Sequence, residues 1–307
     1  MNIPSSYMSK HGVVIIRLAT DFLRKEAGGR VETIEALSQK YDVGRGTVQT
    51  ALNYLIDMDA IRLEKRGHLG TTVSQISYNR LFQIAGVDHV VGVMPLPSSK
   101  VFEGLATGLF KTLNQSAVQF NFSFMTGSKN RLRSILNRRN DFAVMSKASA
   151  VEFLRETSDI KIAYELRSST FITDHALYAR VDYDGYFPGM KVGIDEGSLD
   201  QRDVSEAYFA DKDVVFVPVK YAGISQSLRN KTIDAALWSQ DNLFGFGEGL
   251  KMISLNFQYT PDEKSYPVIV SLKDRDVINA FLLKYVDDNM VSNYQRVIMN
   301  DEAIPMY

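Results

Sequence analysis

The sequence contains no cysteine among its 307 residues, which excludes disulfides, thiolate metal sites and a cysteine nucleophile. Its four histidines, His11, His68, His89 and His175, are scattered and lack the i, i+4 pairing of a helical metal site. The chain has no run of about 18 apolar residues and does not begin with a basic segment followed by an apolar stretch. We therefore expect a cytoplasmic protein that has no membrane span, no metal and no other cofactor.

Catalytic signatures are also missing from the sequence. It has no G-x-S-x-G elbow, no phosphate-binding P-loop and no glycine fingerprint of a dinucleotide site. These absences favour a binding protein over an enzyme, and we predict no catalytic residues.

Charge is balanced over the whole chain, with 35 Lys and Arg against 36 Asp and Glu, but it is unevenly distributed. The segment up to Arg80 has a net charge of +3 and the remainder a net charge of −4. A protein that coats nucleic acid would be far more basic. The asymmetry instead indicates a nucleic-acid partner for the N-terminal part alone.

Hydrophobic periodicity predicts three helices and a hairpin in this N-terminal part. The helices run from about Ser9 to Glu26, from near Thr33, and from about Arg45 to Met58; the strands are Ile61–Lys65 and 71–74. The third helix has an apolar stripe with i, i+3, i+4, i+7 and i+8 spacing, and the turn Asp42-Val43-Gly44 precedes it. This pattern is typical of a helix-turn-helix with a wing.

Polar side chains of the third helix and of the hairpin are the candidate DNA contacts. Arginine can pair with guanine and Gln or Asn with adenine in the major groove, while basic wing residues can contact phosphates. The predicted contacts are Arg45, Thr47, Gln49, Thr50 and Asn53 on the helix, and Lys65, Arg66 and His68 on the hairpin. The alternative is an ordinary three-helix module with a polar surface.

The segment from Val43 to Leu55, with Gly70-Thr71 in the hairpin, resembles a GntR-type winged helix. That family carries a V-S-R-x-T-V-R-x-A-L-x-x-L pattern and a wing that ends in G-T. Here Gly44 replaces the usual Ser, Gln49 replaces the usual Arg, and Glu35 stands where the second helix usually carries an Arg. The resemblance implies a DNA-binding domain whose operator differs from the common one.

A weak internal duplication follows from about Val87. The run Val91–Met94 and the run 192–195 are each followed by a serine-containing loop and a helix, and Asp141–Ser146 matches Asp234–Ser239. Each half is therefore expected to be β-helix-β-helix-β with a parallel sheet, and the segments 176–180 and 268–270 are expected to connect the halves. Such a pair of lobes places a ligand cleft at the carboxyl ends of the strands.

Loops after these strands supply the candidate ligand contacts. Helix N-termini present N–H groups and a partial positive charge to an anion, although a serine there can equally be a plain N-cap. The candidates are Ser98, Ser99, Ser146, Lys147, Arg180, Glu196, Gly197, Ser198, Tyr221 and Ser239. The expected ligand is anionic or, with its ammonium on Glu196, zwitterionic.

Three other features have ordinary explanations. Trp238 could stack on a ligand, but its strand position favours the core. The basic segment with Lys129, Arg131, Arg133, Arg138 and Arg139 is typical of a solvated helix face, and Gly104 and Gly108 favour close helix packing.

The two-lobed part is similar to the type II periplasmic-binding-protein fold, and its fusion to a winged helix resembles the YhfZ-type regulators. The expected fold class is α/β multidomain. A winged helix-turn-helix is expected over residues 1–80 and a two-lobed α/β ligand-binding domain over 87–307. Lobe I is expected at about 87–175 and 268–307, and lobe II at about 181–266.

These features predict a ligand-responsive transcriptional regulator that binds a double-stranded DNA operator as a homodimer, because one recognition helix contacts few base pairs. A small-molecule effector in the cleft would modulate operator binding. The alternative is a cytoplasmic enzyme or binding protein for a small anion, in which the N-terminal domain serves only assembly.

Overall fold

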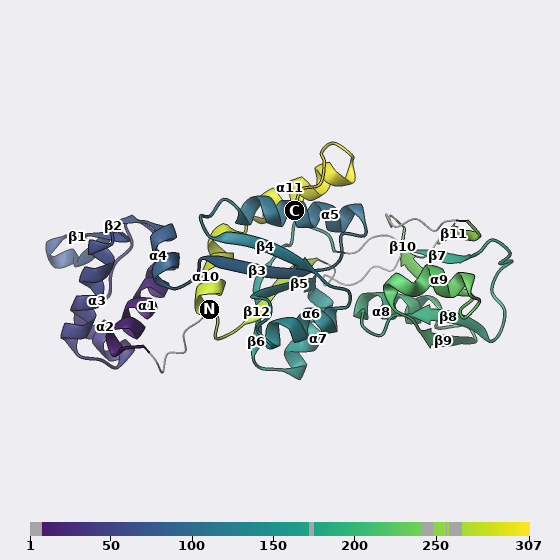
Figure 1. Ribbon diagram of the computed structural model, residues 1–307, viewed down its shortest axis with the longest axis horizontal. Coiled ribbons are helices and arrows are strands. Elements are labelled where there is room, and N and C mark those ends of the chain that lie inside the picture. The colour runs from purple at the N-terminus through teal and green to yellow at the C-terminus, as the bar shows by residue number, and fades with distance from the viewer. Residues whose placement is uncertain (1–7, 172–174, 241–247, 256, 258–265) are drawn as a thin grey trace. The chain divides into compact units, whose positions relative to one another are not determined.

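The computed structural model describes residues 8–171, 175–240, 248–255, 257 and 266–307. Contacts among these residues divide them into two compact units, and Figure 1 traces the chain through both. The N-terminal unit comprises the described residues up to Val90 together with Asn114–Phe120 and Arg275–Tyr285. The C-terminal unit comprises Val91–Leu113, Asn121–Asp274 and Val286–Tyr307.

The N-terminal unit contains the predicted helices and hairpin. Its elements are α1 (Lys10–Leu23), α2 (Ile34–Tyr41), α3 (Arg45–Asp57), β1 (Ile61–Lys65), β2 (Thr71–Ile76), α4 (Tyr78–Ile84) and α10 (Asp276–Tyr285). Serine and threonine caps fix two of the helix starts: Gly12 N donates to Ser9 Oγ and Ala36 N to Thr33 Oγ1, each at 3.1 Å. The helix-turn-helix prediction is confirmed.

The turn between α2 and α3 and the hairpin complete this motif. Asp42 ends α2 in the left-handed conformation, with φ of 54°. Val48, Ala51 and Leu55 of α3 are fully buried, as the apolar stripe predicts. Strands β1 and β2 pair antiparallel, and Lys65 lies opposite Thr71 next to the turn, so the predicted wing is present.

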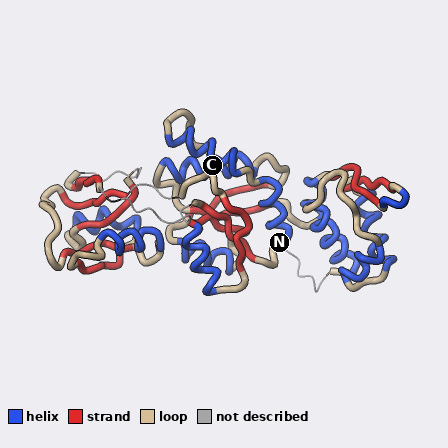
Figure 2. Tube along the Cα trace, turned by 180° about the vertical axis from the view of Figure 1, so that it is seen from behind, coloured by secondary structure: helices blue, strands red, loops and turns tan. Residues whose placement is uncertain are grey.

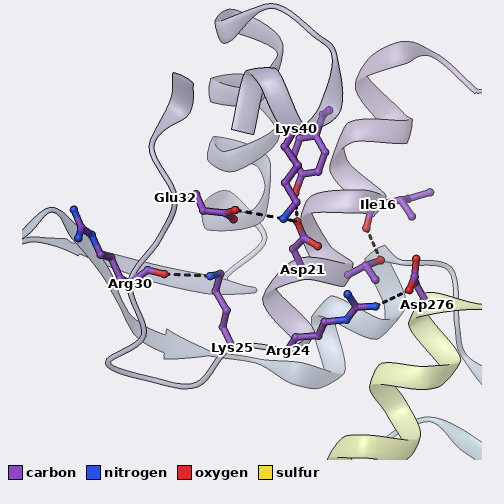
Figure 3. A network of polar contacts seen from close by, with 10 residues as sticks. Ile16, Asp21, Arg24, Lys25, Arg30, Glu32, Lys40 and Asp276 are labelled. Atoms are coloured by element: carbon purple, nitrogen blue, oxygen red, sulfur yellow. Dashed lines mark hydrogen bonds and ion pairs between the residues drawn. The ribbon is translucent and has the colours of Figure 1, made fainter. Parts of the chain in front are cut away.

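A polar network joins α1 to its neighbours, as Figure 3 shows. Lys40 of α2 forms ion pairs with Asp21 of α1 (2.7 Å) and with Glu32 (3.4 Å). The hydrogen bond to Asp21, together with both negative charges, raises the pKa of Lys40. At the other end of α1, Arg24 Nη2 lies 2.6 Å from Asp276 Oδ1 of α10.

Helix α10 is a late segment of the chain that packs within the N-terminal unit. Phe281 is fully buried, and its ring centroid lies 5.6 Å from that of Phe82 of α4 in an edge-to-face contact. Lys284 Nζ lies 3.9 Å from the ring centroid of Tyr78. Neither α4 nor α10 is among the helices predicted from the sequence, because the segments that pack together here are almost 200 residues apart.

The C-terminal unit is built around two five-stranded sheets. Figure 2 shows the strands in red and the helices in blue. Lobe I has the strand order β4-β3-β5-β12-β6. Its elements are β3 (His89–Met94), α5 (Lys100–Leu113), β4 (Gln119–Phe124), α6 (Ser128–Leu136), β5 (Phe142–Ser146), α7 (Lys147–Glu156), β6 (Ile160–Glu165), β12 (Pro267–Leu272) and α11 (Asp288–Met299).

Lobe II has the strand order β11-β7-β10-β8-β9. Its elements are β7 (His175–Arg180), β8 (Met190–Ile194), α8 (Leu199–Tyr208), β9 (Val214–Pro218), α9 (Ile224–Arg229), β10 (Ala235–Ser239) and β11 (Leu250–Ser254). Successive side chains of β10 point to opposite faces of the sheet. Leu237 packs in a cluster with Val204 of α8, and Trp238 packs in a cluster with Leu228 of α9. The two faces of this sheet are therefore packed by different helices.

The sheets are mixed rather than parallel, which corrects the expectation. Strand β3 is parallel to β5, and β8 is parallel to β9 and β10, as the duplicated pattern predicts. The two segments that were expected to connect the halves form strands, as predicted, but they pair antiparallel within the sheets. Strand β7 runs antiparallel to β10, and β12 runs antiparallel to β5.

Close packing of α5 on α11 explains the G-x-x-x-G spacing. A Cβ on Gly104 would lie 2.6 Å from Cα of Gln295, and one on Gly108 would lie 2.7 Å from Cα of Val291. Only glycine permits such a backbone approach. The helix-packing interpretation of these two residues is therefore confirmed.

Candidate functional site

A cavity of about 380 Å³ lies at the carboxyl ends of the parallel strands of both lobes. Lobe I contributes loop residues after β3 and β4 and the first turns of α5 and α6. Lobe II contributes residues after β8 and β9, the last two residues of β10, and residues from the start of β7 and α8. Residues from lobe I include Leu96, Ser98, Phe102, Thr126, Ser128 and Arg131; those from lobe II include His175, Asp195, Ser198, Asp200, Ala222, Trp238 and Ser239.

Three of the predicted ligand residues line this cavity, namely Ser98, Ser198 and Ser239. Two other serines serve as caps. Ser99 Oγ accepts a hydrogen bond from Phe102 N at 3.3 Å, and Ser146 Oγ accepts one from Ser149 N at 3.1 Å. The capping interpretation therefore accounts for Ser99 and Ser146.

The predicted basic residues do not line the cavity. Lys147 is paired with Glu165, and this hydrogen bond, together with those from Arg167 and Tyr266, lowers the pKa of Glu165 to about 2. Arg180 is paired with Asp182 and Asp234 at 3.2 and 3.5 Å.

The direction of β7 explains the position of Arg180. In the antiparallel pair with β10, His175 lies opposite Ser239, whereas Ala179 lies opposite Ala235. The start of β7 is therefore at the cavity, and Arg180 lies at the other end of the strand.

The remaining predicted residues lie at the start of α8 and beside α9. Glu196 is exposed and is not among the cavity-lining residues. Gly197 O lies 2.9 Å from the position that a Cβ on Gly127 would occupy, so the backbones of the two lobes approach closely here. The side chain of Tyr221 lies outside the described part of the structure.

Two residues that the sequence analysis did not propose for this site, Arg131 and Asp200, place opposite charges on its two walls. Arg131 is 4% exposed, and its Nη1 donates to Met125 O at 2.9 Å. Burial lowers the pKa of Arg131 to about 10, and the negative charge of Asp200 opposes this shift. Burial also raises the pKa of Asp200, while a hydrogen bond with Ser146 and the charge of Arg131 oppose that change.

The sequence pattern of α6 indicates that Arg131 is buried. Ser128, Arg131, Leu132 and Ile135 recur at i, i+3, i+4 and i+7, and all four are buried. The solvated-face interpretation is correct for exposed Arg133 but wrong for Arg131. Asp200 had no comparable signal, because an acidic residue in the first turn of a helix ordinarily interacts with the helix dipole.

The candidate DNA-binding surface is the exposed side of α3 with the wing. Arg45 and Glu35 of α2 form an ion pair in which their side chains remain 71% and 50% exposed. Gln49 Nε2 donates to Asn53 Oδ1 at 2.9 Å, and Thr50 Oγ1 donates to Gly46 O at 2.9 Å. Thr47 is partly buried at the start of the helix.

The wing carries the other predicted contacts. Lys65, Arg66 and His68 are exposed. Arg66 Nη2 lies 3.0 Å from Glu64 Oε2, so this guanidinium has a local carboxylate partner. In the N-terminal unit, both the helix and the wing thus present an arginine that is held by a glutamate.

No helix among the described residues is long and apolar enough to cross a membrane. In the same part of the chain, no group of three or more His, Asp or Glu side chains could hold a metal ion.

Comparison with known families gives two matches. Residues 77–307 match the model of the YhfZ C-terminal domain, and residues 26–73 match a helix-turn-helix domain model. The second model does not distinguish a GntR-type helix from other types, so that resemblance stays a prediction.

Individual relatives agree with these matches. The uncharacterized protein YhfZ of Escherichia coli K12 is 29% identical over 98% of this chain and 99% of its own length. The crystal structure of YhfZ from Shigella flexneri is 27% identical and covers 72% of this chain and 94% of that one, with a TM-score of 0.54. The periplasmic VFT2 domain of BvgS from Bordetella pertussis matches at 12% identity over 70% of this chain and 94% of its own, with a TM-score of 0.47.

The architecture follows from the two family matches together with the topology. An N-terminal helix-turn-helix domain precedes a C-terminal α/β domain that contains two five-stranded mixed sheets.

Proposed function

The chain belongs to the YhfZ C-terminal domain family, and from this premise we propose that it is a cytoplasmic transcriptional regulator controlled by a small-molecule effector. The N-terminal helix-turn-helix, of GntR type in this proposal, binds a double-stranded operator. The effector binds in the cavity of the C-terminal unit and modulates operator binding. In this proposal the cavity carries out no reaction.

One observation carries the proposal. The same chain has a helix-turn-helix whose second helix, α3, exposes a polar face, and a cavity that residues of two lobes line. A helix-turn-helix places the start of its second helix against base edges in the major groove. Arg45 and Gln49 occupy that part of α3, and both side chains are exposed. These residue types form bidentate hydrogen bonds with guanine and adenine, respectively.

A homodimer is part of the proposal. A single recognition helix contacts few base pairs, and two copies on a palindromic site multiply the specificity. In a dimer, an effector that changes the lobes would bias operator affinity by changing the spacing or orientation of the two α3 helices.

Helix α10 is suited to transmit such a change. It follows β12 of lobe I after the three residues 273–275, and it packs on α1 and α4 through Asp276 and Phe281. Movement of β12 would therefore be passed along a short covalent connection to the packing of the DNA-binding helices.

Gel retardation on the DNA upstream of the chain's own gene tests DNA binding by α3. Arg45→Ala should weaken specific binding by about 1–3 kcal/mol, because it removes a base contact without touching the core. Arg155→Ala is the matched control, since Arg155 is an exposed arginine of α7 in the C-terminal unit. Equal retardation of the Arg45 variant and the wild type would show that α3 does not contact the operator.

A further inference from the structure

Helix α6 presents two buried polar groups without hydrogen-bond partners among the described residues. Arg131 is 4% exposed and Ser128, one turn earlier, is 2% exposed. Arg131 Nε and Ser128 Oγ have no partner in the described structure, and both residues line the cavity. A buried donor left without an acceptor is energetically costly, so such groups favour a ligand that accepts a hydrogen bond from them.

The start of α6 adds further donors at the same place. The helix spans nine residues, and its N-cap is Gly127, which makes no side-chain capping bond. The first N–H groups of a helix have no acceptor within the helix, and the dipole makes this end favourable for negative charge. Together with Arg131, these donors make the lobe I wall suitable for an anion.

The opposite wall has the opposite charge. Asp195 and Asp200 line the cavity from lobe II. These two carboxylates oppose a doubly charged anion such as a phosphate monoester. A group with a single negative charge on the lobe I side and a positive charge on the lobe II side fits both walls.

The rest of the lining suits an apolar body. Phe102 and Phe171 pack edge to face at the cavity with ring centroids 5.1 Å apart. The volume of about 380 Å³ lies near the lower end of the range of roughly 300–1,000 Å³ for ligand pockets.

We propose that the cavity binds an L-amino acid with an apolar side chain, with its carboxylate on Arg131, Ser128 and the start of α6 and its ammonium group on Asp200. The proposal rests on the function proposed above and names the chemical class of its effector. A carboxylate alone would lie in the same cavity as two aspartates, and an amine alone would leave Arg131 Nε without an acceptor. The amino acid satisfies both walls at once.

Calorimetric titration of the full chain tests the ligand class. The probes are L-leucine, L-isoleucine, L-valine, L-methionine and L-phenylalanine, each with its deaminated and decarboxylated analogue, and inorganic phosphate. At least one amino acid should bind at least tenfold more tightly than both of its analogues, since each analogue loses one charge-assisted contact. Binding of none of the five, equal binding of a deaminated analogue, or tighter binding of phosphate would overturn the proposal.

Variants test the residues. Arg131→Met should weaken amino-acid binding at least tenfold while leaving the melting temperature of the ligand-free protein unchanged or higher, because it removes a buried charge. A purely structural role for Arg131 predicts a lower melting temperature instead. Arg133→Met is the control, since Arg133 lies on the same helix but is exposed.

A second variant keeps the test decisive if Arg131→Met does not fold. Asp200→Asn should weaken amino-acid binding while leaving binding of the deaminated analogue equal or stronger, because the ammonium loses its counter-charge. Equal loss for both probes would contradict the role of Asp200. The calorimetric titration contains no DNA and tests amino-acid binding alone. The gel retardation contains no amino acid and tests DNA binding alone. Failure of the amino-acid proposal is therefore distinguishable from failure of the proposed DNA binding.

Discussion

Replacing Glu35 by glutamine should strengthen binding to duplex DNA, because Glu35 holds the arginine that begins α3. The ion pair of Glu35 with Arg45 lies at the surface, with side chains 50% and 71% exposed. Exposed ion pairs contribute about 0.2–1 kcal/mol, and DNA phosphates must compete with Glu35 for the guanidinium. Glu35→Gln should therefore raise affinity by a factor of about 1.4 to 5, since 1.4 kcal/mol is a factor of ten.

Fluorescence anisotropy on a non-specific duplex measures this effect without knowledge of the operator. Freeing one arginine for a phosphate should steepen the slope of log K against log salt by up to about 0.9. Glu35 lies in the first turn of α2, so the variant should lose at most about 1 kcal/mol of helix-dipole stabilisation and remain folded.

Glu32→Gln is the matched control for this prediction. It makes the same change in net charge, but Glu32 pairs with Lys40 at 3.4 Å and not with an α3 residue. Equal gains from the two variants would show that net charge alone acts. An unchanged or lower affinity of Glu35→Gln would refute the view that Arg45 is a DNA contact that Glu35 restrains.

Two further predictions concern packing. Gly104→Ala should lower the free energy of unfolding by about 1–3 kcal/mol, because its Cβ would lie 2.6 Å from the α11 backbone. Gly12→Ala is the control within α1, where the nearest atoms to the added Cβ would lie at the ordinary contact distance of 3.5 Å. This change should raise the free energy of unfolding by up to about 1 kcal/mol, because alanine is the better helix former. Phe281→Ala should destabilise the N-terminal unit by about 3–5 kcal/mol, because the ring is fully buried, whereas exposed Leu283→Ala should change little. Urea titration followed by circular dichroism measures all four variants, and similar unfolding midpoints within either pair would contradict the packing described.

Local signals explain why the N-terminal elements were predictable. Ser9 and Thr33 cap the helices that they were expected to start, and the stripe that includes Val48 and Leu55 is buried. The Asp42 turn likewise depends on neighbouring residues only. None of these features requires a distant partner, so the sequence pattern sufficed.

The strand-loop-helix repeats of the two lobes were predictable for a similar reason. Short apolar runs and helical stripes located β3, β5, β8 and β10 and the intervening helices. Strand direction was not predictable from these patterns, because an apolar run is the same whether it pairs parallel or antiparallel. The candidate Arg180 was placed at the cleft for that reason, and the antiparallel β7 places it at the other end of the strand.

The candidate site was only partly predictable. Ser98 and Ser198 follow β3 and β8, Ser239 is the last residue of β10, and topology alone brings the three together at the cavity. Arg131 depends on which face of a basic helix is buried, and its buried neighbours Leu132 and Ile135 were the available evidence. Asp200 of lobe II lies at the same cavity as Arg131 of lobe I, and no local pattern encodes this pairing of charges across two lobes.

Effector control of DNA binding is tested by the affinity of the full chain for the DNA upstream of its own gene, measured by anisotropy with and without a saturating apolar L-amino acid. We expect the amino acid that binds most tightly to change the DNA dissociation constant by about 5- to 150-fold, the range of a coupling free energy of roughly 1–3 kcal/mol. A dissociation constant that is identical in the presence and absence of that amino acid would contradict this expectation.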